Sequence, residues 1–486
     1  MTPDEFRRHG AELIEFIARY YETLSAGGGE RRVLSEAEPG DVFNAVPPEA
    51  PEVGEDFAHV ISEIDRVVMP GITHWQSPGF FGYFPASATF PAILGELLSA
   101  GLGVQGMLWQ TSPACTELET RMLDWMGRAI GLPEAFLSEG DGGGVIQGTA
   151  SEAALVAMVA ARQRALDDRG VEETDRAALN GRLVAYASEQ AHSSIVKAAM
   201  VCGIGRSNVR LVGTDGNLAM DAERLRAQVE EDARAGLIPF FVCATLGTTS
   251  TGAIDPLAEI VRIVRPTPSG GGGWVHVDGA YAGAALVCPE HRGMIEGVEL
   301  ADSFNFNPHK WLLVNFDCSC LWVRDRAALV NALSITPEYL RNTQSDAKAV
   351  IDYRDWQVPL GRRFRAMKLW FVMRHYGLEG LRAHIREHVR LAELFESWVR
   401  ADDRFEMVAP RSLSLVCFRL KAGDGATRSL LEKVNATGEV FVTHTVIPFA
   451  GGGGEPVYAI RFAVGAVTVT EADVARAWEI ITAHAT

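Results

Sequence analysis

The chain has 486 residues, of which 47% are hydrophobic and 22% are charged, and these values are typical of a globular protein. The length predicts about two to four domains with a large core, so intrinsic disorder and collagen-like repeats are excluded for the chain as a whole. The 45 basic and 62 acidic residues give a net charge of −17, which argues against nucleic acids and anionic membrane surfaces as partners.

The first 85 residues read as a thin, mainly helical segment. Residues 4–25 carry apolar side chains at helical spacing, and residues 36–54 form a linker rich in proline and glycine. Residues 55–69 form a second amphipathic pattern, which stops at Pro70. Two helices of this kind cannot bury their own apolar faces. We therefore expect residues 1–85 to pack against another surface, for which a second subunit is the candidate.

Residues 86–370 alternate predicted helices with short apolar strands. The expected strands are 182–188, 238–247, 274–280 and 303–308, and the expected helices include 153–166 and 220–235. This alternation is typical of an α/β domain with a doubly wound, mainly parallel sheet. Residues 371–486 combine two long helical patterns with strands at 414–420 and 457–464, which predicts a smaller α+β domain.

Several features of the sequence bear on the cellular compartment of the protein. The seven cysteines are scattered through apolar stretches and form no CxxC pair, so we expect small buried side chains and no metal site. The N-terminus is polar and lacks the apolar core of a signal peptide. Apolar runs such as 153–161 fall short of the roughly 18 residues that span a bilayer. The glycine runs 269–273 and 451–454 are predicted surface loops. These features predict a cytoplasmic protein without a membrane span.

The first motif that carries chemistry is the stretch 142–158, GGGVIQGTASEAALVAM. Glycines precede Thr149, Ala150 and Ser151, and these residues lead directly into a helical pattern. A helix N-terminus offers free N–H groups and the positive end of the helix dipole, so it suits a phosphate. The same pattern also fits an ordinary helix start with Ser151 as its cap.

Lysine is scarce, since only six of the 45 basic residues are lysines. Where a positive charge is enough this chain uses arginine, but only an amine forms a Schiff base. Lys310 follows an apolar strand in SFNFNPHKWLL, 303–313, and burial there would lower its pKa and free the amine to act as a nucleophile. The others lie in helical or polar contexts and are interpreted as surface or packing residues: Lys197, Lys348, Lys368, Lys421 and Lys433.

Two further residues complete a set with Lys310. Asp278 ends the predicted strand in WVHVDGAYAG, where α/β proteins bind ligands, and a buried aspartate requires a cationic partner. His192 follows another predicted strand. A phosphate cradle, a buried aspartate and a buried lysine match the needs of pyridoxal phosphate. Its phosphate must be anchored, its ring nitrogen needs a carboxylate and its aldehyde needs an amine. The sequence therefore predicts this cofactor.

At these residues the sequence resembles the group II pyridoxal-phosphate decarboxylases, and among them the aromatic-L-amino-acid decarboxylases. The similarity covers essentially the whole chain. Its most distinctive stretches are MPGITHWQSPGFFGYFP, SPACTELE, GGGVIQGTASEA, AHSS, ADSFNFNPHKWLLVNFDCS and DYRDWQVPLGRRFR. The resemblance implies the fold type I of pyridoxal-phosphate enzymes, in a homodimer whose active sites lie at the subunit interface. It also implies decarboxylation of tryptophan, phenylalanine, tyrosine or dihydroxyphenylalanine to the corresponding amine and carbon dioxide.

By motif match, the resemblance implies a role for each cofactor residue. Lys310 is the expected Schiff-base lysine, and Asp278 is the expected partner of the ring nitrogen. His192 is expected to stack over the ring, and Ala280 to pack under it. The remaining contacts are expected from Ala150, Ser151, Asn307 and His309 at the phosphate and from Thr249 near the cofactor and substrate.

The resemblance also assigns a proton donor. Tyr339 lies in the polar segment 336–350, which lacks core periodicity, as expected of a mobile lid. It matches the catalytic tyrosine that protonates the substrate Cα after carbon dioxide leaves. Family members with phenylalanine at this position tend to form aldehydes. Tyr339 and His192 therefore both favour amine formation.

Around the substrate, the resemblance implies an aromatic wall with several departures. The wall is expected from Trp75, Tyr83, Phe84 and Pro85. Ala86 stands where animal enzymes carry threonine, and Gln105 and Met107 replace more hydrophobic or aromatic residues contributed across the dimer. Gly361 matches a position at which plant members with glycine accept indoles, so we expect tryptophan to be accepted.

Three alternatives remain open at the level of sequence. The substrate could be glutamate or 2,4-diaminobutyrate, although an acidic side chain would need cationic groups that the stretch 75–85 does not offer. The chain could also be an aldehyde-forming oxidative deaminase on the same scaffold. A degenerate binding module is the third alternative, and the intact set of Lys310, Asp278, His192 and Tyr339 argues against it.

Overall fold

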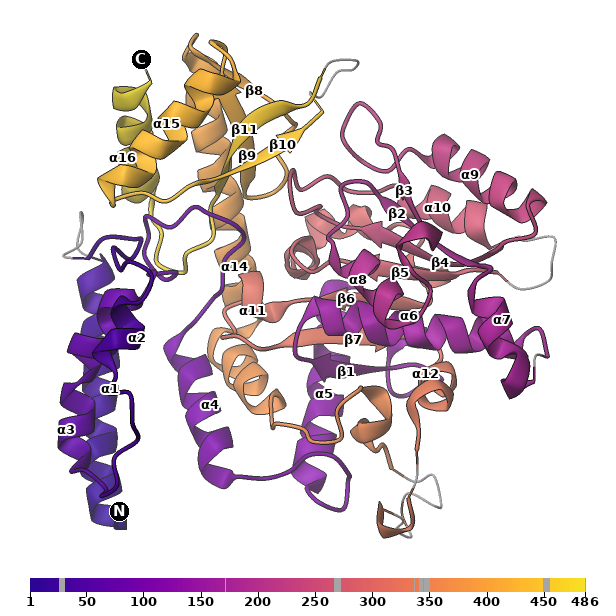
Figure 1. The fold of residues 1–486 in the computed structure, drawn as a ribbon, viewed down its shortest axis with the longest axis horizontal. Coiled ribbons are helices and arrows are strands. Elements are labelled where there is room, and N and C mark those ends of the chain that lie inside the picture. Colours follow the sequence, from indigo (N-terminus) through magenta and orange to yellow (C-terminus); the bar gives the residue numbers. More distant parts are fainter. Residues whose placement is uncertain are drawn as a thin grey trace.

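The apolar strands of the large domain pair into one sheet of seven strands, in the order β1-β7-β6-β5-β4-β2-β3 (Figure 1). Strands β2 to β6 run parallel to one another, whereas β7 is antiparallel to both of its neighbours, β1 and β6. The strands are β1 (Gly143–Gln147), β2 (Leu183–Ser188), β3 (Val209–Val212), β4 (Ile238–Thr245), β5 (Trp274–Asp278), β6 (Ser303–Phe306) and β7 (Ser319–Val323). The predicted, mainly parallel sheet is confirmed.

The computed structural model describes residues 1–25, 31–170, 172–265, 272–335, 337–340, 344, 350–448 and 455–485. Most of the two glycine runs predicted as surface loops lies outside these residues. No helix in the described ranges is long and apolar enough to cross a membrane.

Helices cover both faces of the large sheet, because its central strands are buried on both sides. One face packs against α6 (Ala150–Asp167), α8 (Ser194–Val201) and α12 (Arg326–Leu333). The other face packs against α5 (Pro113–Ile130), α9 (Ala222–Arg234) and α10 (Leu257–Val264). The short helices α7 (Arg176–Asn180) and α11 (Pro308–Trp311) lie in the connections.

Local sequence signals fix the ends of α5, the helix that packs beneath β1. The Ser112 hydroxyl accepts a hydrogen bond from the Cys115 N–H, and Pro113 occupies the first helical position. Gly131 ends the helix with a φ of 81°, a conformation that costs little only for glycine. These ends hold α5 in register under the strand that leads into the phosphate motif.

A second, smaller sheet forms the core of the C-terminal domain. Its four antiparallel strands run in the order β10-β11-β9-β8: Thr443–Ile447, Val457–Ala463, Leu415–Leu420 and Phe405–Met407. It packs against α14 (Ala366–Ala401), α15 (Asp424–Thr437) and α16 (Glu471–His484). The predicted division after residue 370 falls inside α14, which is interrupted at Gly377 by a φ of 62°.

The N-terminal segment lies at one edge of the molecule (Figure 1). It contains α1 (Pro3–Ser25), α2 (Asp41–Ala45) and α3 (Phe57–Ser62), and α4 (Phe90–Leu102) follows it. The pattern at 55–69 is not one helix, because α3 gives way to a π-helical turn at Ile64–Val68. Phe6, Phe43 and Val53 are 60%, 83% and 78% exposed, so this segment leaves apolar side chains uncovered, as expected.

Candidate active site

A cavity of about 210 Å³ opens at the carboxyl ends of the parallel strands, where α/β proteins bind their ligands. Every residue predicted to contact the cofactor lines it. The lining residues are Phe84, Thr149, Ala150, Ser151, His192, Thr245, Gly247, Thr249, Asp278, Ala280, Tyr281, Asn307, His309, Lys310 and Phe316. Segments as far apart in the chain as Phe84 and Phe316 therefore meet in one place, and they include the predicted motifs.

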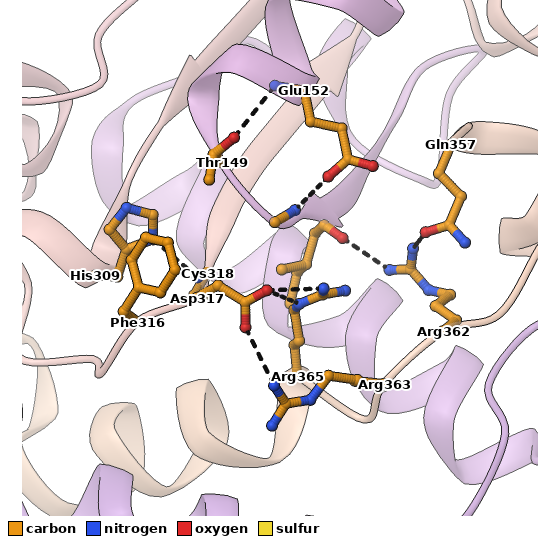
Figure 2. Close-up of polar contacts among 12 residues, drawn as sticks. Thr149, Glu152, His309, Phe316, Asp317, Cys318, Gln357, Arg362, Arg363 and Arg365 are labelled. Carbon is orange, nitrogen blue, oxygen red and sulfur yellow. Dashed lines mark hydrogen bonds and ion pairs between the residues drawn. The ribbon is translucent and has the colours of Figure 1, made fainter. Parts of the chain in front are cut away.

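The phosphate end of the cavity is the N-terminus of α6. Thr149 caps this helix, because its hydroxyl accepts a hydrogen bond from the Glu152 N–H, so the expectation of Ser151 as the cap is wrong. Glu152 in turn accepts a hydrogen bond from the Gly148 N–H at 2.8 Å (Figure 2). The Ser151 hydroxyl and the N–H groups of Ala150 and Ser151 are left available for an anion, as a phosphate requires.

His309 forms the second part of the phosphate end. Its Nδ1 accepts a hydrogen bond from the Cys318 N–H at 2.8 Å, and the Phe316 ring lies beside it (Figure 2). Burial, with a contribution from the charge of Lys310, lowers the pKa of His309 to about 3. The imidazole is therefore neutral at physiological pH and carries its hydrogen on Nε2, which can donate to a phosphate oxygen.

Asp278 defines the opposite end of the cavity. It ends β5, is 4% exposed, and accepts a hydrogen bond from the Ala280 N–H at 3.0 Å. Asn305 Nδ2 lies 3.5 Å from the same carboxylate oxygen. Within the described part of the chain, Asp278 forms no ion pair. A protonated pyridine nitrogen would supply the cation that a buried aspartate requires, and this carboxylate fits it.

Lys310 lies between these two ends, on α11. Its side chain is partly open to the cavity, and its Nζ lies 5.4 Å from the centre of the Phe84 ring. Burial lowers the pKa of Lys310, and the charge of Arg461 acts in the same direction, whereas Asp278 raises it. The lowered pKa favours the free amine, the form that attacks an aldehyde.

Burial alone does not single out Lys310. Lys368 is 1% exposed, and its ammonium pairs with Glu96 at 2.9 Å and lies 3.9 Å from Asp317. Asp317 also pairs with Arg365 at 2.9 Å (Figure 2). Lys368 is thus an ion-pairing residue behind the cavity and not a surface residue, and what distinguishes Lys310 is its position in the cavity.

His192 lies at the rim of the cavity, in the connection between β2 and α8. Its Nδ1 accepts a hydrogen bond from the Ser194 N–H at 3.2 Å. Burial of part of the ring lowers its pKa, while Asp278 raises it. The neutral ring suits the predicted stacking position over the cofactor.

Several residues of the site were not singled out in the sequence, and two of them, Arg461 and Tyr281, lie against the Phe84 ring. Arg461 of β11 is 4% exposed, and it donates hydrogen bonds to the Ser250 carbonyl and the Thr443 hydroxyl. Its guanidinium lies 5.2 Å from the centre of the Phe84 ring. Tyr281 stacks on the same ring at 3.9 Å. An arginine within the apolar strand VYAIRFA was the signal that pointed to Arg461.

Of the predicted substrate residues, only Phe84 lines the cavity of the single chain. Trp75 and Tyr83 are 36% and 53% exposed and stack on each other at 5.5 Å. Gln105 and Gly361 lie together, because a Cβ at Gly361 would be 3.2 Å from the Gln105 Nε2. The remaining three, Pro85, Ala86 and Met107, do not line the cavity either. The Tyr339 side chain lies outside the described structure.

A mainly parallel sheet with a lysine, an unpaired carboxylate and a helix N-terminus around one cavity defines a pyridoxal-phosphate enzyme of fold type I. Comparison with known proteins makes the class specific. The model of the pyridoxal-dependent decarboxylase conserved domain matches residues 39–421. The chain therefore belongs to the pyridoxal-dependent decarboxylase family, with pyridoxal phosphate as its cofactor.

Individual relatives match over the whole chain. The aromatic-L-amino-acid decarboxylase of Bos taurus is 47% identical over 485 residues, which cover 99% of this chain and 96% of the relative. Phenylacetaldehyde synthase of Arabidopsis thaliana is 46% identical over 490 residues, with 99% and 96% covered. Tryptophan decarboxylase of Catharanthus roseus, solved in complex with L-tryptophan, is 42% identical with a TM-score of 0.91, and the match covers 100% of this chain and 98% of that one.

Proposed function

We propose that this chain decarboxylates aromatic L-amino acids to the corresponding amines and carbon dioxide. The observation that carries the proposal is a lysine of lowered pKa and an unpaired aspartate facing one cavity whose wall is aromatic. Phe84 and Tyr281 line this wall. The aromatic substrates named for the relatives in Bos taurus and Catharanthus roseus support the same substrate class.

Each cavity residue has a defined task in this proposal. Lys310 holds the cofactor covalently until the substrate amine replaces it, and the α6 N-terminus, with His309, binds the phosphate. Asp278 keeps a proton on the ring nitrogen. When bound, the cofactor accepts the electron pair that remains on the substrate Cα after carbon dioxide leaves. His192 covers the ring and excludes water, and Tyr339 returns a proton to Cα.

An aldehyde-forming activity is the second candidate, because phenylacetaldehyde synthase of Arabidopsis thaliana is 46% identical to the chain. Tyr339 and His192 support the amine instead, since a proton donor at Cα competes with oxidation there. Gly361 leaves room beside Gln105 and supports tryptophan among the substrates.

We also propose that the working unit is a homodimer in the cytoplasm. Apolar side chains on α4 and the N-terminal segment are exposed in the single chain, and burying them against a second copy would remove this cost. The aromatic pair Trp75 and Tyr83 is also exposed, by 36% and 53%. The seven free, buried cysteines support a reducing compartment.

A substrate panel tests the proposed activity. The holoenzyme is incubated with each of the twenty protein amino acids, and with dihydroxyphenylalanine and 2,4-diaminobutyrate, while carbon dioxide, amine, ammonia and hydrogen peroxide are measured. We expect carbon dioxide and amine in equal amounts from aromatic substrates, tryptophan included. Turnover of glutamate or diaminobutyrate without any aromatic substrate would refute the substrate class. Stoichiometric ammonia and hydrogen peroxide would establish the aldehyde-forming alternative.

A further inference from the structure

A line of polar side chains on β5 and β6 lies on one face of the large sheet and ends at Asp278. Trp274, His276 and Asp278 alternate onto one face of β5, because side chains two residues apart in a strand share a face. The parallel register places Ser303 of β6 beside His276 and Asn305 beside Asp278. All five side chains are buried, with exposed fractions of 4% or less.

The hydrogen bonds in this line have a direction. Trp274 Nε1 donates to the Ser303 hydroxyl at 2.7 Å, and the same hydroxyl lies 2.8 Å from Nδ1 of His276. An indole N–H only donates, so the Ser303 oxygen accepts from Trp274 and its own hydrogen is free for His276. If the Ser303 hydroxyl donates to Nδ1 of His276, the neutral ring carries its hydrogen on Nε2.

The Nε2 side of the His276 imidazole faces the residues that surround Asp278. His276 Nε2 and Asn305 Oδ1 are both buried and have no hydrogen-bond partner at standard geometry in the described structure. Burial lowers the pKa of His276 to about 4, and the neighbouring Asn305 side chain and the charge of Asp278 act in the opposite direction. The Asn305 amide presents its N–H to the Asp278 carboxylate at 3.5 Å.

We propose that His276 and Asn305 are positioning residues for Asp278, and this inference rests on the proposed role of Asp278 at the cofactor ring nitrogen. The neutral imidazole donates from Nε2 to the Asn305 carbonyl, which turns the Asn305 N–H toward the carboxylate. Asp278 is thereby oriented without a competing cation. Its full negative charge stays available for the pyridinium, and this charge keeps the ring nitrogen protonated.

A packing role alone does not explain these polar groups. The His276 ring stacks on Phe241 at 5.9 Å, and a phenylalanine would keep that contact. The polar edge of a buried ring costs free energy unless it is hydrogen-bonded. An imidazole at this position is therefore expected to form hydrogen bonds on both of its nitrogen atoms. The His276→Phe variant therefore keeps the packing contact and removes the hydrogen bonds that would position Asp278.

The first test reads the His276 tautomer in the wild-type holoenzyme. The protein is labelled with ¹⁵N-histidine, and the His276 resonances are assigned by their loss in His276→Gln. We expect a neutral ring with its hydrogen on Nε2 between pH 6 and 8. A hydrogen on Nδ1, or a cationic ring, would overturn the inference, and this measurement needs no variant to retain full stability.

The second test compares His276→Phe and Asn305→Leu with two matched variants. His276→Gln keeps an N–H donor. Cys243→Ala changes a fully buried side chain that sits at the same register on β4, outside the line. The ¹⁵N shift of pyridine-labelled cofactor, the cofactor Kd and the Tm of the apoprotein are measured for each. We expect the Phe and Leu variants to raise the Kd about tenfold and to shift the ring nitrogen toward its deprotonated form.

His276→Gln and Cys243→Ala should keep both properties of the wild type. If His276→Phe and Asn305→Leu lower only the Tm, the two residues are structural and the inference fails. Asp278→Ala is measured in parallel. A ring nitrogen that stays protonated in Asp278→Ala refutes the proposed role of Asp278 itself, whereas deprotonation in that variant alone refutes only the positioning by His276 and Asn305.

Discussion

At the scale of single residues, the site is organised by basic groups whose pKa burial lowers. Burial lowers the pKa of Lys310, of His309 to about 3 and of His276 to about 4. A neutral lysine can attack an aldehyde, and neutral histidines can donate from a fixed nitrogen. Asp278, which forms no ion pair within the described part of the chain, faces the cavity, where the ring nitrogen of the cofactor would be its partner.

The lowered pKa of His276 predicts a specific loss of stability in acid. The unfolded histidine binds a proton near pH 6.5 and the folded one only near 4, so stability is complete above 6.5 and falls as the pH drops toward 4. Between pH 7 and 5 this histidine should cost about 2 kcal/mol of unfolding free energy. Urea unfolding of the apoprotein should show that excess loss in the wild type relative to His276→Gln. Equal losses in the two proteins would contradict it.

Tyr339→Phe should change the product and not the substrate. Without the hydroxyl, the Cα carbanion loses its proton donor, so we expect aldehyde, ammonia and hydrogen peroxide to rise at the expense of amine. Product analysis with tryptophan or tyrosine checks this, with Tyr376→Phe as the control for loss of a tyrosine hydroxyl elsewhere. An unchanged ratio of amine to aldehyde would remove Tyr339 from the proposed role.

At the scale of elements, the phosphate site depends on how β1 is held. The Glu119 carboxylate accepts a hydrogen bond from the Ile146 N–H at 2.7 Å and pairs with Arg362, which donates to the Ile146 carbonyl at 3.1 Å. Gln357 accepts a further hydrogen bond from Arg362 (Figure 2). The end of β1, and with it the turn that enters α6, is therefore fixed by a buried ion pair.

Arg362→Met should weaken both the fold and the phosphate site. It leaves the Glu119 carboxylate buried without its cation, and we expect a loss of about 3 kcal/mol in unfolding free energy together with a higher cofactor Kd. Arg386→Met is the matched control, because Arg386 pairs with Glu290 at the surface and should have little effect. Equal Tm values for the two variants would contradict this account of β1.

The elements were largely predictable from sequence, and the exceptions have physical reasons. The strands ending at Ser188, Thr245 and Asp278 are apolar runs of strand length, and the structure confirms them. The pattern at 55–69 was misjudged because a period of 3.6 does not distinguish an α-helix from a chain that changes to a π-helical turn. The ion pairs of Lys368 could not be predicted, because its partners Glu96 and Asp317 are distant in sequence and meet it only in the folded chain.

The residues of the candidate site were predictable where the neighbouring sequence also shows their place in the fold. Asp278 and Lys310 each end or follow a buried strand, so topology alone brings them together. Arg461 was not singled out, because its contact with the Ser250 carbonyl depends on how the small domain packs on the large one. In the proposed homodimer, the arrangement of Trp75 and Gln105 relative to substrate would depend on the partner surface, which no pattern in one chain specifies.

At the scale of the whole molecule, the exposed apolar side of the chain points to a second copy. Helix α4 packs on α14 through Gly95, and it exposes Phe90, Leu94, Leu97, Leu98 and Leu102 by 43–53%. A row of this kind on one helix is unfavourable in water and typical of an interface. In Figure 1 this helix lies beside the N-terminal segment, so the two form one continuous candidate surface.

Leu98→Asp should convert the dimer into a monomer with little activity, because a charge at the interface is buried without a partner. Leu211→Asp is the control, since Leu211 is 56% exposed on β3, the edge strand of the large sheet. Light scattering after size exclusion should give twice the mass of one chain for the wild type and the control. A monomeric, fully active wild type would contradict the dimer.

The central claim is that Lys310 carries the cofactor and that the buried Lys368 does not. Borohydride reduction of the holoenzyme fixes the cofactor to its lysine, and mass spectrometry of the peptides locates it. The account predicts the label on Lys310 in the wild type, no label in Lys310→Ala, and at least a roughly thousandfold loss of turnover in that variant. A label on Lys368, or an active Lys310→Ala enzyme, would contradict it.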